Sequence, residues 1–300
     1  MDAKSAVPII VSVVIPTYNR RDVVPEAIDS ALAQDIADME VLIVDDGSTD
    51  GSDEQLRRRY SGDGRVRVLR RVNGGPPAAR NTGVAEARGQ YLALLDSDDI
   101  WLPGYLASQL GVLRSADADL VLANAATQGA DGSSQLLFDR PDWELPDSMA
   151  AMCAGAWILT SSTVMRLDVA KKLGFDEAFQ MCDDTEFMFR FHEAGYRCLG
   201  NPDVLALYRA LGTSAGAGQL SADREKLMLG VYRVYQHHSR AHPEVMRRGV
   251  AFDRQFGELL LRAGKPADAY PHLRRFWRAR PLAVSAVWLL LRARLARSAR

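Results

Sequence analysis

Short apolar runs alternate with longer stretches of helical periodicity through the first hundred residues, and few folds accommodate that pattern. The apolar runs are VSVVIP at 11–16, MEVLIV at 39–44, RVRVLRRV at 65–72 and QYLALL at 90–95. Helical spacing fills intervals such as 22–34 and 77–88, and Gly89 is the expected cap of the second helix. The alternation is typical of βαβ units. We therefore predict an α/β, Rossmann-like fold with a mostly parallel sheet.

Two of these apolar runs end in clustered carboxylates. VDDGSTD follows the second run with Asp45 and Asp46, and LLDSDD follows the fourth with Asp96, Asp98 and Asp99. The carboxyl ends of parallel strands meet at one edge of a sheet, and ligands bind there beside the point where strand order reverses. We expect both acidic turns to face one site at that edge.

The DSDD turn has the chemistry of a site for a hard cation. Aspartates separated by one residue on a turn can present oxygen ligands to one ion, and no His or Cys lies nearby. These properties suit Mg²⁺ or Mn²⁺. The alternative is a solvated acidic turn or a helix cap before Pro103, since aspartate is favoured in both.

The composition of the chain changes after the segment YRALGTSAGAG, which ends at Gly218. Residues 221–300 are predicted to be entirely helical, and 256–281 have the pattern of one helical hairpin. We therefore expect two parts, an α/β domain at 1–218 and a helical region at 219–300.

Composition argues against several classes of protein. An apolar fraction of 47% predicts a globular chain with a substantial core, and a formal net charge of -1 gives no overall attraction to nucleic acid. The three cysteines, Cys153, Cys182 and Cys198, lack a CxxC spacing, which indicates reduced thiols in a cytoplasmic protein without structural zinc. Proline interrupts the apolar stretch at 7–15 and no small-residue cleavage site follows, so we expect a strand there rather than a signal peptide.

Five motifs occur in one order along the chain: VVIPTYNR, VDDGSTD, NGGPPAARNTG, LLDSDD and GFDEAFQMCDDTEF. In these motifs the sequence resembles the family-2 glycosyltransferases of the GT-A fold, over roughly residues 10–215. The resemblance implies an inverting enzyme that moves a sugar from a nucleotide-diphosphate donor, with a UDP-sugar favoured, to an acceptor hydroxyl. It also implies a saccharide or lipid-linked acceptor, a place in cell-envelope polysaccharide or other glycoconjugate synthesis, and no nucleic-acid partner.

The resemblance also assigns roles on the donor side. The DxD motif of the family maps onto Asp96 and Asp98, which would hold the Mg²⁺ or Mn²⁺ that bridges the diphosphate, with Asp99 in support. Asp45 would support its own turn. The expected contacts to the donor nucleotide are Pro16, Thr17, Tyr18, Asp46, Asn73, Arg80 and Asp96. By its chemistry Arg80 suits a diphosphate, because its planar fork donates twice, and the alternative for it is a solvated helix residue.

The acidic cluster in GFDEAFQMCDDTEF is the candidate for a general base. Asp183, Asp184 and Glu186 are crowded, which can raise a pKa, although a helix N-terminus also attracts acids. By resemblance, the second member of the family's acidic pair deprotonates the acceptor, and it maps onto Asp184 with Asp183 in support. Relatives often carry His where this chain has Leu211, so Arg209 is expected to neutralise more of the phosphate charge.

Two rival functions remain. The first is a non-catalytic nucleotide-sugar-binding or assembly protein. Leu211 is compatible with it, but the presence of every carboxylate of the family motifs argues against it. A sugar nucleotidyltransferase has a similar core but usually opens with a Gly-rich, basic phosphate loop, which VVIPTYNR does not provide. Acceptor contacts are expected from residues 130–165, where Trp143 and Trp157 either stack on sugar or belong to the core.

The end of the chain is strongly basic. Residues 272–300 contain no acidic residue, and their arginines are Arg274, Arg275, Arg278, Arg280, Arg292, Arg294, Arg297 and Arg300. The apolar run between the arginines is shorter than the ~20 residues that span a bilayer. Such a segment either lies in the interface of an anionic membrane, which would place the protein peripherally at the inner face of the cytoplasmic membrane, or packs on the rest of the protein.

Overall fold

The computed structural model describes nine stretches of the chain: 9–128, 133–136, 158–209, 224–238, 240–242, 246–262, 264–279, 281 and 284–298. The chain divides into two compact units. The first comprises Met1–Ser148 and Ala156–Gln219, and the second comprises Met149–Gly155 and Leu220–Arg300.

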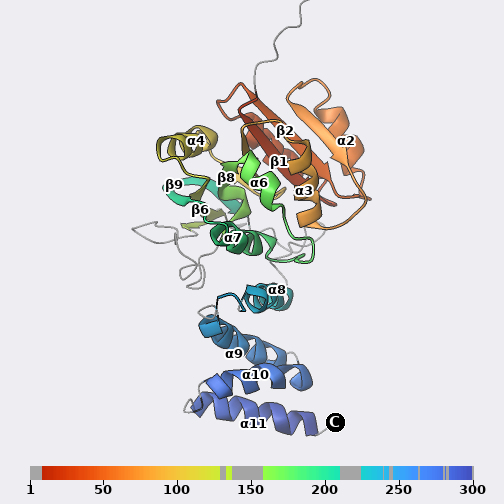
Figure 1. The fold of residues 1–300 in the computed structure, drawn as a ribbon. Coiled ribbons are helices and arrows are strands. Elements are labelled where there is room, and N and C mark those ends of the chain that lie inside the picture. The colour runs from red at the N-terminus through yellow and green to blue at the C-terminus, as the bar shows by residue number, and fades with distance from the viewer. Residues whose placement is uncertain are drawn as a thin grey trace, which may run out of the picture. The chain divides into compact units, whose positions relative to one another are not determined.

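Strands of the first unit form one sheet, which confirms the predicted α/β architecture (Figure 1). Within the described residues its strands are β1 Val11–Thr17, β2 Met39–Asp45, β3 Val66–Arg70, β4 Tyr91–Leu94, β5 Ile100–Trp101, β6 Leu120–Gln128, β7 Ser134–Leu136, β8 Thr163–Arg166 and β9 Cys198–Arg209. Their order is β3-β2-β1-β4-β8-β6-β9-β5, with β7 paired to β6. The first four strands in this order are parallel to one another, and β8 joins β4 antiparallel.

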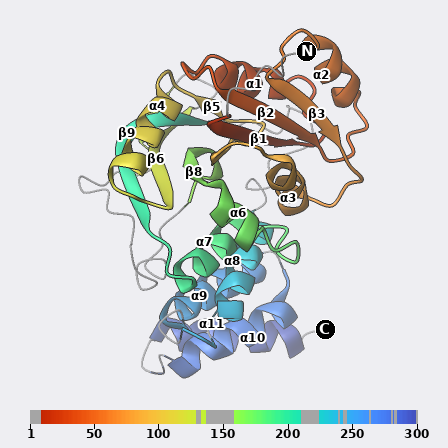
Figure 2. The ribbon, with the colours of Figure 1, turned by 45° about the horizontal axis from the view of Figure 1, so that its top comes forward.

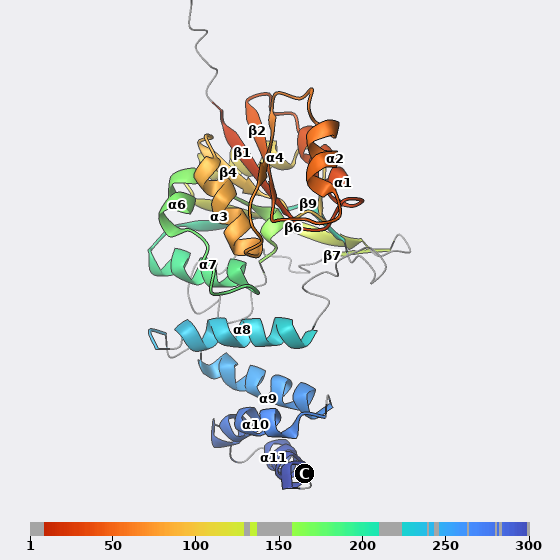
Figure 3. The ribbon, with the colours of Figure 1, turned by 90° about the vertical axis from the view of Figure 1, so that its right-hand side faces the viewer.

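Helices cover both faces of the sheet. They are α1 Val24–Leu32, α2 Ser52–Arg59, α3 Pro76–Glu86, α4 Tyr105–Ser115, α6 Leu167–Leu173 and α7 Asp183–Glu193, with a short 3-10 helix, η1, at Thr160–Ser162. In Figure 3, α1 and α2 lie on one side of β1 and β2, and α3 and α6 lie on the other. Every residue of β2 is buried, which is typical of a parallel strand covered on two faces.

The topology determines where a ligand site can lie. Strand β1 pairs with β2 on one side and with β4 on the other, so the strand order reverses between β1 and β4. Helix α3 packs tightly there, since a Cβ on Gly83 would lie 2.4 Å from a methyl group of Val14. The edge formed by the carboxyl ends of β1, β2 and β4 is therefore the expected binding edge.

Gly89 does not cap helix α3, contrary to the sequence prediction. The helix ends at Glu86, and its C-cap residue Ala87 is extended. Gly89 lies instead against the start of β1, where an added Cβ would be 2.7 Å from the main-chain nitrogen of Ser12. Close backbone packing, rather than a left-handed turn, requires glycine at this position.

The second unit is helical, as the composition of this region predicts. Its helices are α8 Arg224–His238, α9 Met246–Arg262, α10 Pro266–Ala279 and α11 Val284–Ser298 (Figure 2). Each of them packs against the next one along the chain. Their small core consists of Phe256, Leu260, Ala269, Leu273, Leu289 and Ala293. Buried Asp253 accepts hydrogen bonds from Arg275 and lies 2.8 Å from Nδ1 of His272, which ties α9 to α10.

Candidate active site

The two acidic turns and the start of helix α7 belong to the first unit, and hydrogen bonds and ion pairs connect them. Thr17 ends β1, Asp45 ends β2 and Asp96 follows β4, so all three lie at the carboxyl edge of parallel strands. In Figure 3, α7 lies below α3 near the same edge.

Asp46 holds a glycine loop against the end of β2. Its carboxylate accepts from Nη1 of Arg71 at 2.7 Å and from the main-chain N–H groups of Gly74 at 3.1 Å and Gly75 at 2.7 Å. The side chain of Asn73 donates to the carbonyl of Asp46 at 2.9 Å. The predicted donor residues Asp46 and Asn73 are thus in contact, and the carboxylate organises the loop whether or not it also accepts from a base.

Asp45 supports the turn that follows β2. It is fully buried, and the main-chain N–H of Ser48 donates to both of its carboxylate oxygens at 3.3 Å. Burial raises the pKa of Asp45, while the hydrogen bonds from Ser48 and the charge of Arg70 lower it.

The glycine loop also contacts the segment before α7. Gly75 has a φ of +87°, and a Cβ there would fall 1.7 Å from Oε1 of Gln180. The amide of Gln180 donates to the carbonyl of Gly74 at 3.1 Å. A residue with a side chain at position 75 would be strained and would displace Gln180.

Ser161 of η1 holds the DSDD turn through hydrogen bonds. The Ser161 hydroxyl donates to the carboxylate of Asp99 and accepts from the main-chain N–H of Asp96 at 3.0 Å. Its carbonyl accepts from the indole N–H of Trp101 at 2.6 Å. The main-chain N–H of Arg209 donates to the other Asp99 oxygen at 3.3 Å. Asp99 is only 1% exposed, so it anchors the turn instead of facing a ligand.

Burial raises the pKa of Asp99 well above its usual range, and the neighbouring charges of Asp98 and Asp96 raise it further. Two of the three aspartates, Asp96 and Asp98, keep exposed carboxylate surface, with side chains 29% and 15% exposed.

Basic side chains surround the DSDD turn. Arg20, which follows β1, lies 3.4 Å from the carboxylate of Asp98. Arg209 donates through Nε to the main-chain carbonyl of Asp98 at 2.6 Å and forms an ion pair with Glu26. Arg209, which the sequence predicted to neutralise phosphate, therefore lies beside the DSDD turn as expected. Its guanidinium binds protein groups there.

Arg80 joins the DSDD turn to helix α7. Its guanidinium donates through Nη2 to Asp96 at 2.8 Å and through Nη1 to Asp183, the first residue of α7. Its side chain is 6% exposed, so it is a buried bridge and not the solvated helix residue of the alternative interpretation.

Asp184 lies directly beside this bridge. The hydroxyl of Thr160 donates to its carboxylate at 3.3 Å, and the main-chain N–H of Thr185 donates to it at 2.6 Å. Burial and the charge of Asp183 raise the pKa of Asp184 to about 6, although Arg80 acts in the opposite direction. A carboxyl group with such a pKa is mostly ionised at neutral pH and can still accept a proton readily.

Two buried polar atoms at this edge lack a hydrogen-bond partner among the described residues, and an exposed ring follows the first strand. Thr17 is 3% exposed, and its hydroxyl has no hydrogen-bond partner among the described residues. The same holds for Nε of Arg80. Tyr18 is 42% exposed and follows the partly buried Pro16, so its ring can pack on a planar group such as a base.

The donor set fits the metal predicted from the sequence. Among the residues that the structure describes, no group of three or more His, Cys, Asp or Glu side chains could hold an ion by itself. Mg²⁺ commonly binds through one or two carboxylates and completes its shell with water and substrate phosphates. Asp96 and Asp98 supply two hard oxygen donors of this kind, so the residues fit Mg²⁺ or Mn²⁺.

Sequence reasoning missed Arg20, Arg71, Thr160 and Ser161. Arg20 could have been found, because it is a cation three residues after the first strand and within VVIPTYNR. Ser161 and Thr160 carry no sequence signal, since serine and threonine are common in any turn. Three further predicted positions, Leu211, Trp143 and Trp157, lie outside the described residues.

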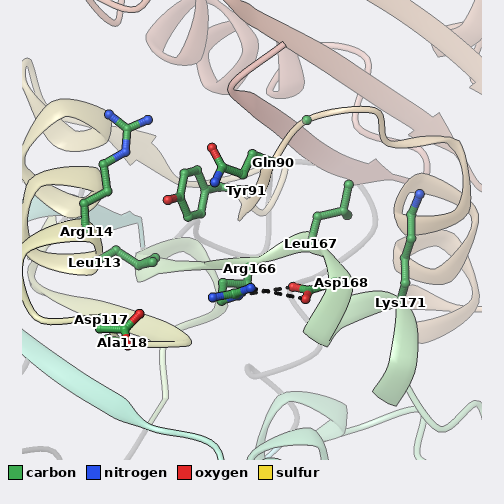
Figure 4. A pocket seen from close by; sticks show the side chains of 11 residues that line it. Gln90, Tyr91, Leu113, Arg114, Asp117, Ala118, Arg166, Leu167, Asp168 and Lys171 are labelled. Atoms are coloured by element: carbon green, nitrogen blue, oxygen red, sulfur yellow. Dashed lines mark hydrogen bonds and ion pairs between the residues drawn. The ribbon is translucent and has the colours of Figure 1, made fainter. Parts of the chain in front are cut away.

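A cavity of about 600 Å³ lies at the opposite edge of the sheet (Figure 4). It is lined by the first residue of β4, Tyr91, and by the last residue of β8, Arg166, so it faces away from the acidic turns. Arg166 pairs with Asp168, and Lys171 donates to the carbonyl of Ala87. The third cation, Arg114, stacks 5.4 Å from the centre of the Tyr91 ring, so each cation of this cavity has a protein partner.

Comparison with known proteins identifies relatives of the first unit. Residues 12–165 match the profile of the family described as Glycosyl transferase family 2. The chain is 31% identical over 212 residues to glycosyltransferase GlyG of Streptococcus pneumoniae serotype 4, covering 67% of this chain and 70% of that protein. It is 43% identical over 197 residues to a chondroitin synthase of Pasteurella multocida, covering 62% of this chain but only 19% of that protein.

Solved structures support the same assignment of the fold. A crystal structure of S. aureus TarS 1-349 matches with a TM-score of 0.62 and 21% identity, covering 96% of this chain and 87% of that one. The mannosyltransferase PcManGT from Pyrobaculum calidifontis, in complex with GDP-Man and Mn²⁺, matches with a TM-score of 0.64 and 19% identity, covering 95% and 86%.

Proposed function

Because this chain belongs to glycosyl transferase family 2 and has the GT-A fold, we propose that it transfers a sugar from a nucleotide-diphosphate donor, most favourably a UDP-sugar, to an acceptor hydroxyl with inversion. The observation that carries this proposal is the Arg80 bridge. It brings a donor-side carboxylate, Asp96, and the acidic start of α7 to one sheet edge, with Asp184 next to the bridge.

The reaction is a single in-line displacement. Asp184 accepts the proton of the acceptor hydroxyl while the acceptor oxygen forms a bond to the anomeric carbon. The bond between that carbon and the diphosphate oxygen breaks, and the electron pair leaves with the nucleoside diphosphate. The anomeric configuration inverts because attack and departure occur on opposite faces.

Other residues hold the donor. Thr17 and Tyr18 would contact the nucleoside, and the loop held by Asp46 would close on it. Asp96 and Asp98 would hold Mg²⁺ or Mn²⁺, which when bound offsets negative charge on the departing diphosphate. Arg20 lies beside Asp98 and adds positive charge to the same place.

Donor binding is tested by thermal unfolding with UDP-, GDP- and dTDP-sugars in the presence of Mn²⁺. We expect a UDP-sugar, the proposed donor, to raise the melting temperature most. A ligand at a hundredfold over its Kd stabilises the folded state by about 2.7 kcal/mol. Failure of all three classes to shift the melting temperature would contradict the proposed donor. Slow hydrolysis of the stabilising donor separates an enzyme from a protein that only binds nucleotide sugar.

We further propose that the acceptor is a saccharide or lipid-linked saccharide and that the helical unit contacts the inner face of the cytoplasmic membrane. Trp277 is 36% exposed and Trp288 is 60% exposed, and the guanidinium of Arg292 stacks 5.5 Å from the Trp288 ring. Arg278 is also exposed. Tryptophan beside arginine suits the headgroup region of an anionic bilayer. No described helix has the length and apolar character needed to cross a bilayer.

Membrane contact predicts that the protein pellets with anionic vesicles at low salt and less at physiological salt. The double variant Arg278→Glu/Arg292→Glu should bind at least about thirtyfold more weakly, since two arginines contribute about 2 kcal/mol. The matched control is Arg57→Glu/Arg58→Glu on α2, which makes the same charge change on the first unit. Equal pelleting of both double variants, or pelleting with neutral vesicles alone, would contradict the membrane proposal.

A further inference from the structure

Arg80 contacts two protein carboxylates, which a side chain that only binds phosphate does not require. It lies in the middle of α3, and two of its guanidinium nitrogens donate to carboxylates that are far apart in sequence, Asp96 after β4 and Asp183 at the start of α7. Its guanidinium carbon lies 5.7 Å from the centre of the Phe175 ring. A single side chain thus connects the donor turn, the segment before α7 and α7 itself.

A planar fork suits this connection. The guanidinium presents donors in fixed directions, so one arginine can serve two carboxylates at once, whereas an ammonium is a compact point charge. The bridge is also buried, because the side chain of Asp183 is only 8% exposed. Removing one partner of such a buried pair leaves an uncompensated charge, which is strongly destabilising.

The charges around Asp184 link the bridge to the chemistry. Among charged groups, Asp183 and Arg80 have the largest effects on the pKa of its carboxyl, and Asp96 acts on it with the same sign as Asp183. Thr160 and Thr185 contribute only hydroxyl and main-chain dipoles. Arg80 therefore favours the ionised base, and Asp183 opposes it.

We propose that Arg80 is a positioning residue that ties the donor-side Asp96 to the helix carrying Asp184, and so fixes the general base relative to the donor. This inference rests on the proposed function. It differs from the phosphate role expected from the sequence, because both terminal nitrogens of the guanidinium already bind protein carboxylates.

Three variants test the proposal by changing charge and geometry separately. Arg80→Lys keeps the charge but loses the two separate nitrogens that hold Asp96 and Asp183, so kcat should fall by about 10²-fold, the scale of a 1 Å misplacement. The acid limb of its pH profile should stay in place. Arg80→Gln should lower kcat similarly and move that limb to higher pH, since the cation that favours ionised Asp184 is lost. Asp183→Asn should lower kcat and move the limb to lower pH, because the opposing carboxylate is lost.

Donor Kd, measured by calorimetry, should stay within about threefold of wild type in all three variants, since positioning of the base acts on kcat. The matched control is Arg190→Lys, which disturbs another pair on α7, Arg190 with Glu186, and should leave the pH limb unchanged. Melting temperatures identify any variant that fails to fold, and Arg80→Lys is the mildest of the three. A tenfold or larger rise in donor Kd with kcat unchanged would overturn the proposal and make Arg80 a phosphate ligand.

One readout does not depend on turnover. The carboxyl ¹³C shift of Asp184, assigned by its loss in Asp184→Asn, should titrate at higher pH in Arg80→Gln and at lower pH in Asp183→Asn. If no sugar is transferred but these shifts occur, the proposed function fails while the arrangement of the three charges stands. If transfer occurs and the titration does not move in either variant, the inference about Arg80 fails alone.

Discussion

Replacing Asp184 with asparagine is expected to lower turnover by about 10²-fold or more while donor affinity stays unchanged. The amide has nearly the same shape as the carboxyl group but cannot take up the acceptor proton. Steady-state kinetics at saturating donor measure the first effect, and titration calorimetry with the donor measures the second.

The pH dependence provides the control for this variant. Burial and the charge of Asp183 raise the pKa of Asp184 to about 6, and a base acts only when it is ionised. Wild-type kcat should therefore rise as pH increases through about 6 and level off near neutrality. The remaining activity of Asp184→Asn should lack this rise. A variant that keeps the acid limb, or that loses donor binding but not turnover, would place the base elsewhere.

Replacing Asp98 with asparagine is expected to abolish the dependence of donor affinity on Mn²⁺. A neutral amide is a poorer ligand for a hard cation than a carboxylate, and a site with only two protein carboxylates has no spare donor. Donor titrations with Mn²⁺ and with chelator should give one Kd for the variant and two clearly different values for wild type.

The variant also breaks the ion pair between Asp98 and Arg20, so a second protein is needed for comparison. Arg20→Gln removes the same pair but keeps the carboxylate. Its donor affinity should still respond to Mn²⁺. If Asp98→Asn responds to Mn²⁺ as wild type does, Asp98 is not a metal ligand, and the acidic turn has another reason for its charge.

The fold was largely predictable from local pattern. The β-branched runs, with helical spacing between them, predicted β1 to β4 and the sheet edge at which Asp46 and Asp96 lie, because burial on both faces leaves a strong apolar signal. The candidate residues near strand ends were likewise visible, since Asp, Gly and Asn stand there in recognisable motifs. The family match supports that resemblance independently.

The partners of these residues were not predictable. Arg80 and Asp183 are separated by 103 positions in sequence, and Ser161 and Asp99 by 62, so no local pattern connects either pair. Arg80 was expected to point to a diphosphate because its motif and chemistry allow it. Its two carboxylate partners become visible only when α3, β4 and α7 are packed. Gly89 was misassigned for the same reason, since its neighbour at Ser12 is remote in sequence.

The hydrogen bonds from Ser161 to the DSDD turn have an entropic consequence. Fixing the backbone of one residue costs roughly 1–2 kcal/mol at 25 °C, and a free acidic loop would have to be ordered when its ligand arrives. Here Ser161 holds Asp96, Asp99 and Trp101 together through its hydroxyl and carbonyl. That ordering has already occurred during folding, although the carboxylates repel one another. The turn is therefore preorganised for its ligand. Little of the free energy of the ligand contacts is spent on ordering the loop, so more of it contributes to affinity.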